Sequence, residues 1–156
     1  MKIAIQGLGE VPNPARLVLE EEKPDKSYVI ASDYQLDYVC ERRDFKEPNK
    51  EVIKTAAEEA GTELVIKKCD PFDLDEITDT IAGILEEISD EADEVLVNYT
   101  GGSANLRVVL GFTGVTLTRL CPTKIIYAVG YPSGPKIVTD NAEKLRDIYR
   151  RLNKLF

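Results

Sequence analysis

Two glycine-bearing segments contain the residue types that could bind an anion. The first covers residues 6–14 (QGLGEVPNP) and the second covers residues 98–103 (NYTGGS). Glycines allow a sharp turn and a close approach of backbone N–H groups to a ligand, and Ser103 can cap the following helix or donate from its N-terminus. A Gly-Gly-Ser step is also typical of a tight strand-to-helix connection closed by a capping serine. From these residues alone, both interpretations of the second segment stay open.

The residue inventory excludes several kinds of chemistry. The chain has no histidine, which excludes Ser-His-Asp and Cys-His nucleophiles, histidine general bases and histidine-ligated zinc. The spacing Gly7-x-Gly9-x-x-Pro12 lacks the third glycine of a dinucleotide fingerprint, and neither glycine segment continues into the Lys-Ser/Thr pair of an ATP-binding P-loop. We therefore expect no nucleotide cofactor and no metal centre.

The composition is that of a folded, acidic protein. With 156 residues, 43% of them hydrophobic and 31% charged, the chain can bury a sizeable core, and we expect one domain over residues 1–156. The formal net charge is −8, and 11 acidic residues but no basic residue lie between Lys68 and Arg107. This balance disfavours duplex nucleic acid as a partner, although a small anion could still bind to the less acidic part of the surface.

The three cysteines and the longest apolar stretch indicate where the protein resides. The cysteines are far apart and form no C-x-x-C pair, so neither a disulfide framework nor a zinc site is predicted. The longest apolar stretch, around Val108 to Phe112, is far shorter than the roughly 18 residues that a membrane span requires. We expect a cytoplasmic protein without a membrane partner.

Short β-type runs alternate with helix-type segments along the whole chain. Strands are predicted over residues 2–6, 27–32, 63–68, 94–99 and 124–130, and helices over residues 13–22, 48–61, 73–88, 103–117 and 141–156. Asn13 and Ser103 are predicted to cap the first and fourth of these helices. Residues 33–47, which include Tyr34 and Arg42, lack a clear period, and loops of this length are often functional.

This alternation predicts an α/β fold, a Rossmann-like three-layer αβα sandwich with a mainly parallel sheet of five or six strands in the order 3-2-1-4-5. In this order the first and fourth strands are neighbours, and their carboxyl ends flank the topological switch point where ligands bind in such sheets. The two glycine segments follow these two strands. We therefore expect them to meet at one crevice.

The segment Glu94–Ser103 (EVLVNYTGGS), followed by an apolar helix and the strand Lys124–Gly130, resembles the signature of CRISPR-associated Rossmann-fold (CARF) domains. That family typically has apolar-Asn-x-Thr-Gly-Gly-Thr/Ser-Lys at its fourth strand. The Asn13-Pro14 turn and the Pro24-Asp25-Lys26 lead into the second strand are also similar to it. The resemblance implies a homodimer that binds a cyclic oligoadenylate second messenger, with a separate effector protein as a further partner.

The resemblance also implies which residues bind the ligand. Thr100 to Ser103 match the family's ligand-binding turn, Asn98 braces it, and the first glycine segment lines the pocket. Where the family commonly has lysine, this chain has Ala104, for which Asn105 or Arg107 could partly substitute. The predicted ligand-binding residues are Gln6, Gly7, Leu8, Gly9, Asn13, Asn98, Thr100, Gly101, Gly102, Ser103, Asn105 and Arg107.

The missing lysine favours a sensor over an enzyme. Some members of the family are ring nucleases, which cleave the messenger without a metal and require positive charge on the developing pentacoordinate phosphate. A ring nuclease is the first alternative, with no catalytic residue assigned. A generic nucleotide-binding domain that reached a similar turn independently is the second.

Overall fold

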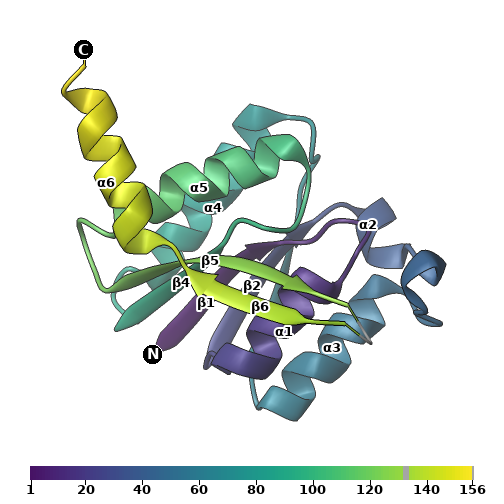
Figure 1. The fold of residues 1–156 in the computed structure, drawn as a ribbon. Helices are drawn as coiled ribbons and strands as arrows, with labels where there is room; N and C mark the ends of the chain where they lie inside the picture. Colours follow the sequence, from purple (N-terminus) through teal and green to yellow (C-terminus); the bar gives the residue numbers. More distant parts are fainter. Residues whose placement is uncertain (132–133, 156) are drawn as a thin grey trace.

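A computed structural model describes residues 1–131 and 134–155 of the chain (Figure 1). The elements in chain order are β1 (Lys2–Gly7), α1 (Asn13–Glu22), β2 (Lys26–Ala31), α2 (Asp33–Asp37), the 3₁₀ helix η1 (Glu41–Arg43), α3 (Asn49–Ala60), β3 (Glu63–Lys68), α4 (Leu74–Ile88), β4 (Glu94–Asn98), α5 (Ala104–Leu117), β5 (Thr123–Gly130), β6 (Lys136–Asp140) and α6 (Ala142–Asn153). The described helices include none long and apolar enough to span a bilayer.

The strands form one sheet in the order β3-β2-β1-β4-β5-β6. Strands β1 to β5 are parallel and β6 is antiparallel to β5. The predicted α/β class and the order 3-2-1-4-5 are thus confirmed, with a sixth strand added at the β5 edge. Gln6 pairs with Asn98 across β1 and β4, so these two strands end at the same level and their outgoing turns start side by side.

Helices cover both faces of the sheet, with α4 and α5 on one face and α1 and α3 on the other (Figure 1). Ile5 and Val97 pack with Ile84 and Leu110 on the first face, while on the second Val29 packs with Ile53. Side chains of this size each contribute about 1.5–3 kcal/mol when buried. Because both faces of β1 and β4 are covered, their ends are held rigidly.

The stretch 33–47, predicted as one long loop, contains two short helices. Helix α2 begins with a capping box in which the Ser32 hydroxyl accepts from the Gln35 N–H and the Gln35 side chain accepts from the Ser32 N–H. The segment then turns through η1 and leads to α3. Most of its length is therefore ordered by local hydrogen bonds rather than by a periodic apolar face.

The last helix is shorter than predicted; it lies against α5 and β5, and its carboxyl end projects beyond the sheet (Figure 1). It ends at Asn153, and Ala142 is its buried residue. Phe156, where the sequence placed the end of this helix, lies outside the described residues.

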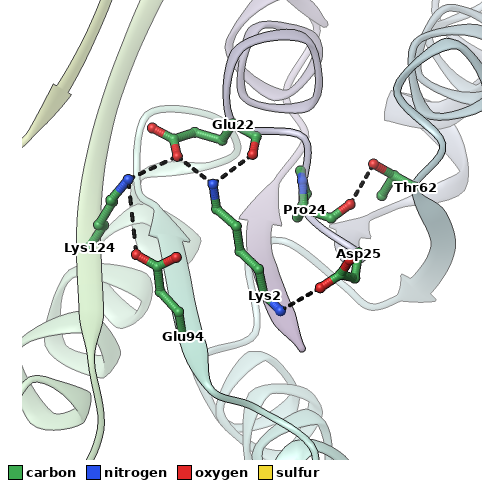
Figure 2. A network of polar contacts seen from close by, with 7 residues as sticks. All are labelled: Lys2, Glu22, Pro24, Asp25, Thr62, Glu94 and Lys124. Atoms are coloured by element: carbon green, nitrogen blue, oxygen red, sulfur yellow. Dashed lines mark hydrogen bonds and ion pairs between the residues drawn. The ribbon is translucent and has the colours of Figure 1, made fainter.

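A network of ion pairs and hydrogen bonds lies at the amino edge of the sheet (Figure 2). The Lys2 ammonium donates to the Glu22 carboxylate at 2.8 Å and to the Glu22 carbonyl at 2.6 Å, and the Lys124 ammonium donates to the same carboxylate at 3.0 Å. Burial alone would raise the pKa of Glu22, but the bonds from the two lysines outweigh it and leave the pKa below its ordinary value. These bonds fasten the end of α1 to the starts of β1 and β5.

Candidate functional site

The two glycine turns meet backbone to backbone at the carboxyl edge of the sheet, as predicted. A Cβ atom placed on Gly7 would lie 2.5 Å from the carbonyl oxygen of Gly101, and one placed on Gly9 would lie 3.3 Å from the Gly102 nitrogen. Gly102 has a φ of +100°, which favours glycine. Gly7 and Gly101 have no room for side chains, so this contact requires glycine in both turns.

Asn98 braces the second turn from below. Its amide nitrogen donates to Gln6 Oε1 at 3.1 Å and to the Pro14 carbonyl at 3.2 Å, while its Oδ1 accepts from the Thr100 N–H at 3.0 Å. The side chain is fully buried. One side chain therefore ties together β1, the start of α1 and the turn before α5, which is the bracing role that the sequence predicted.

The polar side chains of the second turn are also bonded to protein groups. Thr100 Oγ1 accepts from the Ala128 N–H at 2.7 Å, and Ser103 Oγ donates to the Pro71 carbonyl at 2.6 Å while capping α5 through the Leu106 N–H at 3.1 Å. The Asn105 amide donates to the Phe72 carbonyl at 3.1 Å. The predicted Ser103 cap is confirmed. These side chains set the shape of the turn and hold the loop before α4 against it.

The amino end of α5 is the electropositive feature of this edge. A helix leaves its first N–H groups without partners inside the helix, and they point along the axis toward its start. The Ser103 hydroxyl accepts a hydrogen bond from the Leu106 N–H. The backbone N–H groups that precede Leu106 in the turn can donate to an anion above the edge. Neutral donors of this kind need no lysine at position 104.

Six of the predicted ligand-binding residues are buried below this edge instead of exposed in it, namely Gln6, Gly7, Leu8, Asn13, Asn98 and Gly101. Gln6 and Leu8 are 0% exposed, because Gln6 donates to Ser27 Oγ at 2.9 Å and Leu8 packs in the core beside α1 and α3. Asn13 is 2% exposed and does not cap α1. Pro12, already in a helical conformation, occupies the cap position, so Asn13, which was predicted as the cap, is instead the first helical residue.

Two pockets flank the start of α5. The larger, of about 610 Å³, is lined by Gly9, Glu10, Tyr34, Phe72, Gly102 and Ser103, among others. The smaller, of about 460 Å³, is lined by Tyr99, Thr100, Ala104, Arg107, Val108 and Tyr127. Arg107 is exposed there and brings a cation to the smaller pocket. Of the predicted ligand-binding residues, Gly9, Gly102 and Ser103 line the larger pocket, and Thr100 and Arg107 line the smaller one.

Comparison with known proteins supports this fold. No family model matches the sequence, and no curated protein matches it. Csm6 from Enterococcus italicus, solved with cyclic hexa-2'-fluoro-hexa-dAMP, matches 97% of this chain with a TM-score of 0.68 and 14% identity. Can2 from Sulfobacillus thermosulfidooxidans, solved with cyclic tetra-adenylate, matches 88% with a TM-score of 0.57 and 16% identity.

A type III CRISPR defence DNA nuclease activated by cyclic oligoadenylate matches 68% of this chain with a TM-score of 0.51 and 16% identity. These are CARF-domain proteins. This chain has a CARF-type fold. At such identities the likeness concerns the fold, and the chain spans 45%, 36% and 16% of the three matched chains, less than half of each.

Sequence reasoning missed several residues that line the larger pocket of this CARF-type fold. Glu10, Asp70 and Phe72 line it, yet none belongs to a recognisable motif. Tyr34 was noted only as part of a long loop. A usable signal was the position of these residues, since each follows a parallel strand and must therefore lie at the carboxyl edge.

Two carboxylates, those of Glu10 and Asp70, line the larger pocket and can accept hydrogen bonds there. The neighbouring Cys69 thiol lies in the hydrophobic core. Burial, with the Glu76 and Asp70 carboxylates, raises the pKa of this thiol to about 11. The thiol therefore stays protonated at neutral pH and is a poor nucleophile.

An exposed apolar face lies beside the site of the CARF-type fold, on α4 and α5. Val108, Phe112 and Leu120 are 55%, 69% and 75% exposed. A groove of about 420 Å³ between the helices is lined by Leu85, Val109 and Phe112, among others. Contiguous apolar surface of this kind typically marks a contact with another protein.

Proposed function

We propose that this chain is a sensor domain that binds a cyclic oligoadenylate at the carboxyl edge of its sheet. The observation that carries the proposal is the backbone contact between the Gly7–Gly9 and Gly101–Gly102 turns, which sets the amino end of α5 between two open pockets. Proteins with the same fold, Csm6 and Can2, were solved with cyclic hexa-2'-fluoro-hexa-dAMP and cyclic tetra-adenylate. The chemistry of the turn suits a phosphodiester, because backbone amides at a helix start bind phosphate oxygens.

Two copies of the chain would complete the site. The exposed apolar face of α4 and α5 includes Val108, and the same residue lines the smaller pocket. An isologous contact through this face would place two α5 starts near a two-fold axis, and a cyclic ligand with repeating phosphates matches that symmetry. The dimer therefore makes a single ring per two chains the expected stoichiometry.

Binding without cleavage is the activity that the turn supports best. Ser103 donates its hydroxyl proton to the Pro71 carbonyl and Thr100 Oγ1 accepts from the Ala128 N–H, so neither hydroxyl is bonded to a side-chain base that would activate it as a nucleophile. Arg107 supplies positive charge to the smaller pocket. Ring cleavage would require cations that stabilise the negative charge on the transition-state phosphate. Cleavage is therefore the alternative function, and analysis of the reaction products distinguishes it from binding alone.

Isothermal titration calorimetry with cyclic tetra-adenylate and cyclic hexa-adenylate tests the proposal. We expect saturable heat with at least one ring, a stoichiometry of one ring per two chains, and weaker binding of AMP. Chromatography of the same mixtures in EDTA should return intact rings. Linear products would establish the ring nuclease, and tighter binding of AMP than of either ring would favour a generic nucleotide-binding domain. Absence of binding to both rings would refute the sensor.

A further inference from the structure

Two exposed aromatic side chains line the larger pocket from different elements. Tyr34 on α2 is 63% exposed, and Phe72 in the loop before α4 is 81% exposed. Aromatic rings left in water beside a concave site are typical of surfaces that contact a ligand or partner. Neither ring is needed for the core, since the buried clusters on both sheet faces are complete without them.

The Tyr34 ring is held in position by its neighbours. Its hydroxyl donates to Glu10 Oε1 at 3.2 Å, and its ring lies 5.6 Å from the Tyr38 ring, centroid to centroid. Arg42 donates to the other Glu10 oxygen at 3.3 Å. Partial desolvation and the Glu10 carboxylate raise the pKa of Tyr34, so its phenol stays protonated and keeps this bond at neutral pH.

Phe72 is fastened directly to the turn that starts α5. Its N–H donates to Asp70 Oδ1 at 2.9 Å, and its carbonyl accepts from the Asn105 amide. The preceding carbonyl, of Pro71, accepts from the Ser103 hydroxyl at 2.6 Å. The backbone that carries the phenyl ring is therefore fixed relative to the turn that starts α5.

We infer that Tyr34 and Phe72 are the stacking walls for an adenine base of the ring, with the adjoining phosphate on the Gly101–Ser103 turn. This inference rests on the proposed function and adds how the base is recognised. Aromatic walls stack on any base, whereas the Glu10 and Asp70 carboxylates that line the same pocket accept hydrogen bonds. Adenine carries an exocyclic amine that can donate to them, and uracil carries a carbonyl in its place, so the pocket favours adenine over uracil.

The test compares three variants by calorimetry with cyclic tetra- or hexa-adenylate, whichever binds the unmodified protein more tightly. The double variant Tyr34→Ala/Phe72→Ala should raise Kd at least about tenfold. Tyr34→Phe keeps the ring and should bind within about threefold of the unmodified protein. Tyr149→Ala removes a tyrosine that is 42% exposed on α6, and its Kd should not change. A cyclic uridylate of the same ring size should bind more weakly than the adenylate.

The outcomes separate this inference from the proposal beneath it. A double variant that is folded by circular dichroism and binds like the unmodified protein overturns the stacking walls while the sensor stands. An equal loss in Tyr149→Ala, or equal affinity for the uridylate ring, overturns the inference as well. If the unmodified protein binds neither adenylate ring, both are overturned.

Discussion

The two edges of one sheet use polar groups in opposite ways. At the amino edge, charged side chains satisfy one another, with Glu22 between Lys2 and Lys124 (Figure 2). At the carboxyl edge, the buried polar side chains are neutral amides such as Gln6 and Asn98, and the turns above them expose backbone N–H groups. The charged network at the amino edge stabilises the fold, whereas at the carboxyl edge the backbone amides at the start of α5 can donate to a ligand.

The largest expected effect comes from a substitution that forces the two glycine turns apart. In Gly101→Ala the new Cβ would clash with the Gly7 carbonyl, which should lower the free energy of unfolding by about 3 kcal/mol and abolish ring binding. Gly9→Ala meets the Gly102 nitrogen at 3.3 Å and should fold while binding more weakly. Urea unfolding and calorimetry measure both effects.

Gly83→Ala is the matched control for these variants. Gly83 lies in α4, and a Cβ placed there meets nothing within 4 Å. The substitution should stabilise the protein by up to about 1 kcal/mol through helix propensity and leave binding unchanged. If Gly101→Ala behaves like Gly83→Ala, the turns are not in the contact described.

Asn98→Asp should have the next largest effect. The aspartate still accepts from the Thr100 N–H but loses the donations to Gln6 and the Pro14 carbonyl, and it buries a carboxylate next to two oxygens. We expect a loss of about 2 kcal/mol in the free energy of unfolding and weaker ring binding. Unchanged stability would show that the amide does not brace the turn.

Glu22→Gln should have the smallest effect, and it should be confined to stability. The lowered pKa of Glu22 means that its ion pairs stabilise the fold above its unfolded pKa of about 4.3 and that this contribution is lost as the pH falls through the lower folded pKa. At pH 7 the variant should lose about 1.5 kcal/mol. The difference from the unmodified protein should shrink as the pH falls below about 4.3 and vanish only below the lowered folded pKa, while ring binding at pH 7 stays the same.

A pH-independent difference, or a change in ring binding at pH 7, would contradict this division between the edges. Urea unfolding across the pH range measures the first quantity, and calorimetry measures the second. Lys124 offers an independent check, because its ammonium binds the same carboxylate at 3.0 Å. The free energy of unfolding of Lys124→Met should therefore be lower than that of the unmodified protein at pH 7, and this difference should shrink over the same acidic pH range as for Glu22→Gln.

The parts of the fold with a strong pattern could be predicted from the sequence. The five parallel strands contain apolar runs, and their alternation with helices predicted the order that the sheet has. Strand β6 was missed because it is mostly exposed, with Lys136 and Asp140 at its ends, and it is held by backbone pairing to β5. Helix α2 was missed because it is only five residues long and its one sequence signal is the capping box formed by Ser32 and Gln35.

The candidate site was predicted in its backbone and only partly in its side chains. The meeting of the two turns follows from sheet topology, so Gly7 and Gly101 could be foreseen. The side chains exposed at the edge depend on where α1 begins and on whether Gln6 and Leu8 point into the core. No short sequence motif determines either feature. Tyr34 and Phe72 reach the pocket from segments distant in sequence, and three-dimensional packing was needed to bring them together.

Amide chemical shifts in an NMR titration with the cyclic oligoadenylate that binds test the central claim most directly. Ring binding at the carboxyl edge should shift the amide signals of Gly9, Gly102 and Ser103 and leave those of Lys2 and Lys124 in place. Shifts that gather around Lys2 and Lys124, with the glycine turns unaffected, would contradict the account.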